Sequence, residues 1–261
     1  MARFLTLASA GAVVMLLSLG WPKQVCASET DGAALPATKV AALRSTIEGQ
    51  TQGKVKVKSV RSTPIQGIYL VETGTEVFYV DESGRYGFAG AALIDMQRQK
   101  DLTAGHMERM QRIDFQELPL QHAIKEVRGN GSRQLAVFED PNCPICKVFT
   151  KFVDQLTDVT VYKFPFPVIA PDSIPLARMA WCAPERGSAW RAIMAGQRPT
   201  DAPQNCDTSG LVEILKVGER YGIQNTPTVV LANGKRLVGA TPPEQFITEL
   251  DASTASVTSR R

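Results

Sequence analysis

A C-x-x-C motif between a buried strand and a helix constrains this chain more than any other feature. Cys143 and Cys146 follow the apolar run 135–138, which is typical of a central buried strand, and a helix with one apolar face follows them. Pro144 suits the first helical position, where its missing N–H is not needed. Backbone N–H groups and the helix dipole favour a thiolate at Cys143. The motif therefore predicts Cys143 as a nucleophile toward disulfides and Cys146 as the covered thiol that releases a trapped partner.

Zinc binding and a purely structural disulfide are the alternatives for this motif. A zinc ribbon needs a second close pair of cysteines, whereas Cys182 and Cys206 are 24 residues apart. The chain has two histidines, His106 and His122, which excludes a His-rich site. A structural disulfide within 143–146 would close so small a ring that it adds little entropic stability. We therefore expect a redox dithiol with no metal and no cofactor.

Cys182 and Cys206 favour a different interpretation. They are isolated from each other, and the loop between them is rich in Pro and Gly. A bridge that closes a loop of about 25 residues contributes roughly 3.5 kcal/mol in the chain-entropy model. We expect this pair to form a structural disulfide.

Residues 1–27 have the features of a secretory signal peptide. A basic start precedes a charge-free stretch, and Val25 and Ala27 supply small residues for cleavage after position 27. An uncleaved membrane anchor is the alternative, because the stretch is just long enough to span a bilayer. Cleavage removes Cys26 and leaves an even number of cysteines, which indicates disulfide chemistry in an exported protein.

Composition excludes several classes of protein. The chain has 261 residues, of which 44% are hydrophobic and 21% charged, so it can build one large core or two small ones. The apolar fraction excludes a disordered chain, and the low Gly and Pro content excludes a collagen-like one. A formal net charge of +3 without a concentrated basic stripe predicts no nucleic-acid partner.

The segment 28–96 is predicted to be a domain without reactive groups. A helix over 36–49 precedes strands over 54–60, 68–71, 77–80 and 86–94. A meander with one helix has a thin core, so it would gain stability by pairing with a second copy through an edge strand.

The remainder divides into a polar linker helix over 97–117, a catalytic domain over 118–251 and a flexible tail over 252–261. The catalytic domain is predicted to alternate strands and helices. Its strands are expected at 135–138, 159–164, 228–231 and 236–238, and its helices after Cys146, at 175–182, near Trp190, at 210–221 and at 245–250.

The second half resembles the DsbC/DsbG family of periplasmic thiol:disulfide isomerases. The motifs are FEDPNCPIC, WC at 181–182, NC at 205–206 and GIQNTPTVVLANGKRLVGATPPEQF, in order between Leu135 and Leu250, while the first half matches more loosely. The resemblance implies an α+β, cystatin-like N-terminal dimerisation domain, a linker helix and an α/β thioredoxin-like domain with a helical insertion. It implies a V-shaped homodimer with an apolar cleft. It also implies that the Cys143–Cys146 dithiol is kept reduced by an inner-membrane reductase of the DsbD type.

The resemblance also assigns residues. Cys182–Cys206 becomes the permanent disulfide, and Pro227 becomes a cis-proline that, with Thr226, Pro144 and Ile145, contacts extended substrate.

Two departures from related proteins concern the chemistry of the dithiol. Val137 stands six residues before Cys143, where thioredoxin and DsbA resemble each other in having a buried carboxylate, so one proton acceptor for Cys146 is missing. The dipeptide Pro144-Ile145 replaces the usual Gly-Tyr or Pro-Tyr. The sequence predicts a periplasmic disulfide isomerase and reductase for misoxidised secreted proteins. A DsbG-like sulfenic-acid reductase, a net thiol oxidoreductase and a holdase chaperone with secondary redox activity are the rivals.

Overall fold

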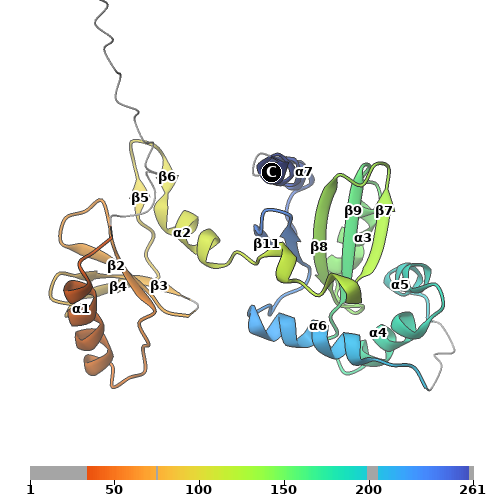
Figure 1. The fold of residues 1–261 in the computed structure, drawn as a ribbon, viewed down its shortest axis with the longest axis horizontal. Coiled ribbons are helices and arrows are strands. Elements are labelled where there is room, and N and C mark those ends of the chain that lie inside the picture. Colours follow the sequence, from red (N-terminus) through yellow and green to blue (C-terminus); the bar gives the residue numbers. More distant parts are fainter. Residues whose placement is uncertain (1–33, 75, 199–204, 259–261) are drawn as a thin grey trace, which may run out of the picture. The chain divides into compact units, whose positions relative to one another are not determined.

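The chain divides into two compact units, with the boundary between Gly90 and Ala91 (Figure 1). The computed structural model describes residues 34–74, 76–198 and 205–258. The expected signal peptide, with Cys26, lies outside the described residues. Among the described residues, no helix combines the length and apolar character needed to cross a membrane.

The first unit packs helix α1 (Ala37–Gln50) on an antiparallel meander of four strands in the order β1-β2-β3-β4. The strands are β1 (Ser59–Ser62), β2 (Ile68–Glu72), β3 (Val77–Asp81) and β4 (Gly87–Ala89). The core is small and consists of Leu43, Ile47, Val57, Val60, Val71 and Val80. Strand β4 lies at one edge of this sheet, and all three of its residues are exposed.

The strand expected at 54–60 is wrong over residues 54–58. Strand β1 begins only at Ser59, because the preceding segment turns around the end of α1. Gln52 and Gly53 both have positive φ, and the Glu48 carboxylate accepts a hydrogen bond from the N–H of Val57 at 3.0 Å. The alternation of Lys and Val over 54–57 therefore reflects burial of Val57 and not pairing in a sheet.

The second unit is built on a five-stranded sheet in the order β11-β10-β8-β9-β7. Strands β8 and β9 are parallel, and the other pairs are antiparallel. The strands are β7 (Ile124–Arg128), β8 (Arg133–Glu139), β9 (Val159–Pro165), β10 (Thr228–Leu231) and β11 (Arg236–Val238). Strand β8 is buried on both faces, which is why its sequence is a continuous apolar run.

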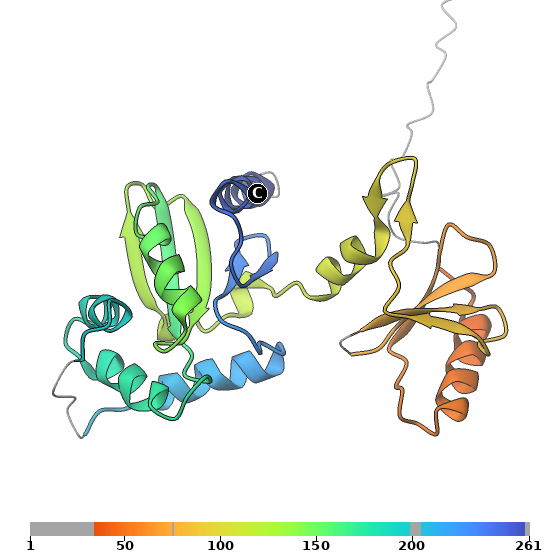
Figure 2. The ribbon, with the colours of Figure 1, turned by 180° about the vertical axis from the view of Figure 1, so that it is seen from behind.

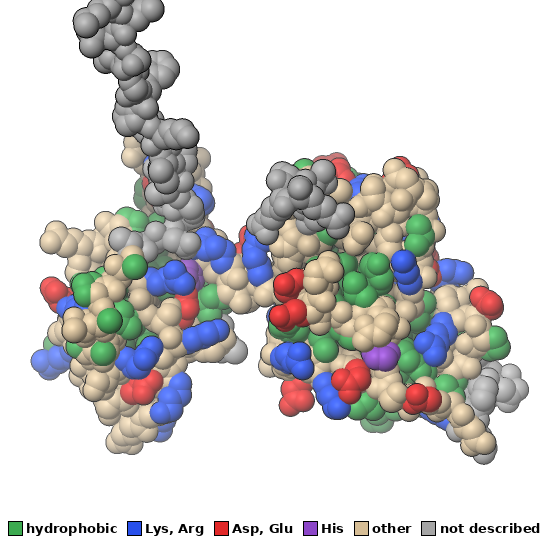
Figure 3. Space-filling model, in the orientation of Figure 1, with side chains coloured by type: hydrophobic (Ala, Val, Ile, Leu, Met, Phe, Trp, Pro, Cys, Tyr) green, Lys and Arg blue, Asp and Glu red, His purple; other side chains and the backbone are tan. Residues whose placement is uncertain are grey.

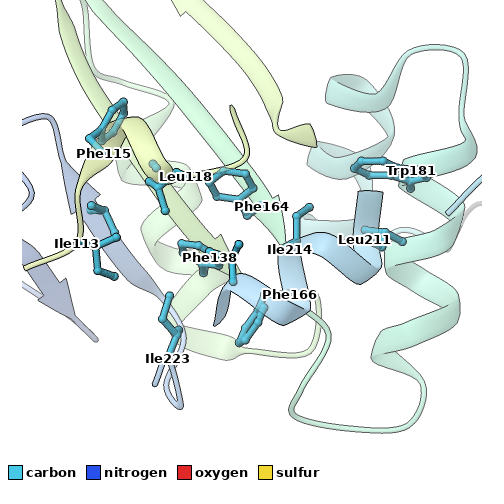
Figure 4. Close-up of a cluster of buried hydrophobic side chains, with 13 residues drawn as sticks. Ile113, Phe115, Leu118, Phe138, Phe164, Phe166, Trp181, Leu211, Ile214 and Ile223 are labelled. Atoms are coloured by element: carbon cyan, nitrogen blue, oxygen red, sulfur yellow. The ribbon is translucent and has the colours of Figure 1, made fainter. Parts of the chain in front are cut away.

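Helices cover both faces of this sheet. On one face, α3 (Pro144–Val153) lies along the sheet, as Figure 2 shows. Side chains of α3 and α7 (Pro243–Thr258) pack there on Leu135 and Val137. On the other, α6 (Ser209–Arg220) packs on Ala136 and Phe138. The cluster on that second face is shown in Figure 4, and its labelled members are Ile113, Phe115, Leu118, Phe138, Phe164, Phe166, Trp181, Leu211, Ile214 and Ile223.

A helical insertion follows β9. It contains α4 (Ser173–Cys182) and α5 (Arg186–Met194), and the disulfide Cys182–Cys206 joins the end of α4 to the start of α6. Helix α5 makes this loop more regular than its Pro and Gly content indicates. The indole N–H of Trp181 donates to the carbonyl of Asp207 at 2.9 Å, so the bridge lies at a closely packed junction.

Two helix boundaries differ from expectation. The linker helix expected over 97–117 is reduced to α2 (Leu102–Met110), which follows the hairpin of β5 (Ile94–Asp95) and β6 (Lys100–Asp101). It ends there because the N–H of Ile113 bonds to the carbonyl of Gly234 at 3.0 Å. The tail expected from residue 252 is helical as far as Thr258, and Ser253 is buried.

Replacing both Cys182 and Cys206 by Ala should lower the free energy of unfolding by about 3 kcal/mol, because the loop they close is then unconstrained in the unfolded chain. Denaturant unfolding of the variant and the wild-type protein measures the difference. The double variant that folds should keep the thiol chemistry of Cys143 and Cys146. Free thiols at both positions in the oxidised wild-type protein, detected by mass spectrometry, would contradict this pairing.

Candidate active site

The two cysteines of the C-x-x-C motif lie at the N-terminus of α3. Cys143 is the N-cap residue, and its Sγ accepts a hydrogen bond from the backbone N–H of Cys146 at 3.2 Å. The Cys143 thiol donates to the carbonyl of Thr226 at 3.3 Å. Both cysteines are free thiols. A sulfur that receives a helix N-terminal N–H is placed where negative charge is stabilised.

Cys146 has a different environment. It is fully buried, in a cluster with Cys143 and residues of α4 and α5. Burial raises the pKa of the Cys146 thiol far above its usual value, its hydrogen bond with Cys143 raises it further, and the Thr226 hydroxyl opposes this rise. At neutral pH Cys146 is therefore a thiol that must lose its proton before it can attack.

The structure brings Thr226 and Pro227 to the dithiol, 83 residues away in sequence. Strand β10 pairs antiparallel with β8, so its first residue, Thr228, lies opposite Phe138 near the end of β8 that leads to Cys143. The Thr226–Pro227 peptide bond is cis. Four of the sequence-predicted site residues, Cys143, Cys146, Thr226 and Pro227, thus share one location.

Pro144 and Ile145 lie on the first turn of α3 and are exposed, with Ile145 44% accessible. They present an apolar surface beside Cys143. The disulfide Cys182–Cys206 is placed elsewhere, since both of its residues pack against the core cluster under α6. It belongs to the scaffold of the domain.

Asp140 is a residue of this site that the sequence reasoning did not single out. It is fully buried between β8 and Cys143, and its carboxylate accepts four hydrogen bonds. The donors are the N–H groups of Asn142, Val168 and Ile169 and the hydroxyl of Ser173, at 2.7 to 2.9 Å. Asp140 therefore ties the active-site turn to the segment that follows β9.

Glu139 was also missed. Its carboxylate is 1% exposed, with bonds from the Thr150 hydroxyl at 2.8 Å and the Trp190 indole N–H at 2.9 Å. Burial raises its pKa, and the charge of Lys163 opposes the rise. The site thus holds a buried carboxylate despite Val137. Strand periodicity could have found it, because Glu139 lies two residues after Val137 and so on the same face of β8.

No group of three or more His, Cys, Asp or Glu side chains within 34–74, 76–198 and 205–258 is arranged to hold a metal ion. The chemistry available at the site is that of a buried dithiol and the polar groups beside it.

Two family models match the chain. A thioredoxin-like domain matches residues 120–254, and a disulfide bond isomerase protein N-terminal domain matches residues 32–104. A five-stranded sheet with a dithiol at a helix N-terminus and this pair of domains define the class of thiol–disulfide oxidoreductases. The two matches confirm the expected fold class, an N-terminal DsbC-type domain followed by a thioredoxin-like domain.

Two curated relatives are thiol:disulfide interchange proteins. The probable thiol:disulfide interchange protein DsbC of Bordetella pertussis is 37% identical over 191 residues, which cover 73% of this chain and 67% of the relative. The thiol:disulfide interchange protein DsbC of Escherichia coli K12 is 27% identical over 218 residues, which cover 77% and 85%. A disulfide interchange protein structure from Neisseria gonorrhoeae is 38% identical, covers 52% of this chain and 99% of its own, and has a TM-score of 0.49. The chain belongs to the DsbC/DsbG family of thiol:disulfide interchange proteins.

Iodoacetamide should alkylate Cys143 of the reduced protein at least about tenfold faster than Cys146, because burial raises the pKa of the Cys146 thiol and each unit of that rise lowers its thiolate fraction tenfold. Peptide mapping after brief labelling measures both rates. As a control, Cys146→Ala should leave labelling at Cys143 fast, whereas Cys143→Ala should leave Cys146 slow. Faster labelling at Cys146 would contradict the assignment of Cys143 as the nucleophile.

Proposed function

We propose that this protein is a periplasmic disulfide isomerase and reductase that acts on misoxidised secreted proteins through Cys143 and Cys146. The observation that carries the proposal is the position of the Cys143 sulfur. It lies at the N-terminus of α3, 3.2 Å from the N–H of Cys146 and 3.3 Å from the carbonyl of Thr226. This position, between the N-terminus of α3 and the segment that precedes β10, supports Cys143 as the nucleophile.

The proposed reaction begins with attack of the Cys143 thiolate on one sulfur of a substrate disulfide. A bond forms between Cys143 and that sulfur, and the other substrate sulfur leaves as a thiolate. A different substrate thiolate then attacks the mixed disulfide, which restores Cys143 and creates a new substrate pairing without net oxidation. Alternatively Cys146 attacks Cys143, so that the substrate is reduced by two electrons and the dithiol becomes a disulfide.

An apolar rim supports binding of unfolded protein. Its exposed side chains are Ile145, Val148, Val168, Ile169 and Ile174. The hydrogen bonds of Asp140 to the N–H groups at 168 and 169 hold that segment against the turn that carries Cys143. Elsewhere the surface shown in Figure 3 mixes hydrophobic side chains with both signs of charge. Exposed apolar groups beside a reactive sulfur suit a partner that displays its own core.

We propose further that the first unit forms a homodimer through strand β4. This edge strand is exposed, and Phe88 and the neighbouring Tyr86 are 60% and 64% accessible. An unpaired strand edge with aromatic side chains is suited to pair with a second copy across a two-fold axis.

Two further steps complete the proposal. The protein is exported with cleavage after Ala27, and its dithiol is reduced by an inner-membrane DsbD-type reductase. They follow from the signal-like sequence and from the family.

Cys146→Ala should make the protein accumulate mixed disulfides with its substrates, because the mixed disulfide at Cys143 then lacks its intramolecular release and only a substrate thiolate can resolve it. Incubation with scrambled ribonuclease followed by non-reducing electrophoresis measures the trapped complex, and regain of ribonuclease activity measures isomerisation. The Cys143→Ala control should form no complex and restore no activity. A double Cys143→Ala, Cys146→Ala variant that retains all protection of ribonuclease against aggregation would show a chaperone activity separate from the dithiol.

Phe88→Lys should shift the protein from dimer to monomer in sedimentation at micromolar concentration, because a charge at the edge of β4 opposes strand pairing. Ile65→Lys is the matched control, since Ile65 is also an exposed apolar side chain but lies between β1 and β2. A wild-type monomer, or equal dissociation by both substitutions, would exclude the β4 interface.

A further inference from the structure

Glu139 is a buried carboxylate that the reaction described above does not use. Its two oxygens accept one hydrogen bond each, both from neutral donors, the Thr150 hydroxyl and the Trp190 indole N–H. A carboxylate offers about four acceptor positions, so about half of its capacity is free. The neighbouring Asp140, in contrast, uses its carboxylate on four donors. Of these two adjacent carboxylates, Glu139 is the one whose oxygens accept fewer hydrogen bonds.

The location of Glu139 connects it to Cys146. Thr150, which bonds to Glu139, lies one helical turn after Cys146 on α3, and both are buried on the same helix face. Residues four apart on a helix have Cβ atoms about 5–6 Å apart. Trp190, the second donor, belongs to the buried cluster that contains both cysteines. Glu139 and Cys146 also interact electrostatically.

Buried charges of both signs surround Glu139. Lys163 on β9 is fully buried and favours ionised Glu139, while Asp154 after α3 opposes it. The Nζ of Lys163 lies 3.1 Å from Glu126 on β7 and 3.4 Å from Asp154. The ionisable groups facing Glu139 are therefore Cys146 and Asp154 from the α3 segment and Lys163 from β9, with Glu126 behind Lys163. These surroundings act on the pKa of Glu139 in opposite directions, because burial and Asp154 raise it and Lys163 lowers it.

We propose that Glu139 is the proton acceptor for Cys146 when the dithiol releases a mixed disulfide. The inference rests on the proposed function. The proton of the Cys146 thiol moves to the Glu139 carboxylate, directly or through one water. The Cys146 sulfur bonds to Cys143, the bond between Cys143 and the substrate breaks, and the substrate sulfur leaves with the electron pair. Glu139 then returns its proton to solvent, where the substrate thiolate can take one up.

The test uses the reduced full chain and Ellman's reagent, an aromatic disulfide that releases one coloured thiolate when Cys143 attacks and a second when Cys146 resolves. Glu139→Gln should slow the second phase about 100-fold at neutral pH, a typical contribution of a general base. Gln fits the site, because the Thr150 hydroxyl can rotate to accept from the amide. In the wild-type protein, the second-phase rate should show an inflection at the pKa of Glu139, which Glu139→Gln should remove.

A purely electrostatic role predicts the opposite sign. The charge of Glu139 raises the pKa of Cys146, so its neutralisation alone would accelerate the second phase. An unchanged or faster second phase in Glu139→Gln therefore overturns the proposal. Glu126→Gln is the matched control, since it alters the same charge network through Lys163 but should leave the second phase unchanged. Equal slowing in both variants would also overturn it.

Thr150→Val keeps the test decisive if Glu139→Gln does not fold. This near-isosteric change removes a hydrogen bond that lowers the pKa of Glu139, so the inflection should move to higher pH. An inflection that stays in place contradicts the assignment. A missing first phase in the wild-type protein would instead refute the proposed function, because Cys143 would then not attack a disulfide at all.

Discussion

The buried carboxylate of Asp140 is the interaction on which the active-site end of the second unit depends. Parallel pairing of β8 with β9 brings the carboxyl ends of both strands to one edge of the sheet, and Asp140 then joins the two chain segments that leave it. Its bond to the N–H of Asn142 shapes the turn into α3, and its bonds to Val168 and Ile169 hold the apolar rim. Four short hydrogen bonds satisfy a charge that would otherwise be costly to bury.

The surroundings of the two cysteines differ. Cys143 and Cys146 are both buried, but only Cys143 receives the helix N-terminal N–H at its sulfur. Cys146 is surrounded by apolar side chains of α4 and α5, which disfavour its thiolate. The helical insertion therefore does more than enlarge the domain, because it supplies the cover of Cys146 and, through Trp190, one of the two donors to Glu139.

Much of the fold could be predicted from local patterns. The apolar run 135–138, the hairpin around Asn233 and the amphipathic helix after Cys146 all form where periodicity places them. The predicted secondary structure is wrong where a hydrogen bond outside the local pattern fixes the backbone. Glu48 binds the segment that resembles a strand at 54–58, and Gly234 binds Ile113 and ends the linker helix early. Gly234 is far from Ile113 in the sequence, and the bond of Glu48 depends on how the chain turns after α1, so the hydrophobic pattern reveals neither contact.

The sequence by itself determined the dithiol and the helix that carries it, because these depend on residue type and short-range spacing. Its motifs also resemble one family, and that resemblance implies the candidate contact residues. Only the tertiary structure decided which buried groups face that dithiol. Strand pairing brings Thr226 to Cys143, and the insertion brings Trp190 to Glu139. A carboxylate two residues beyond Val137 is an ordinary strand residue in the sequence. Its pKa rises only because α3 and α5 exclude water from it, since burial raises the free energy of its charged form.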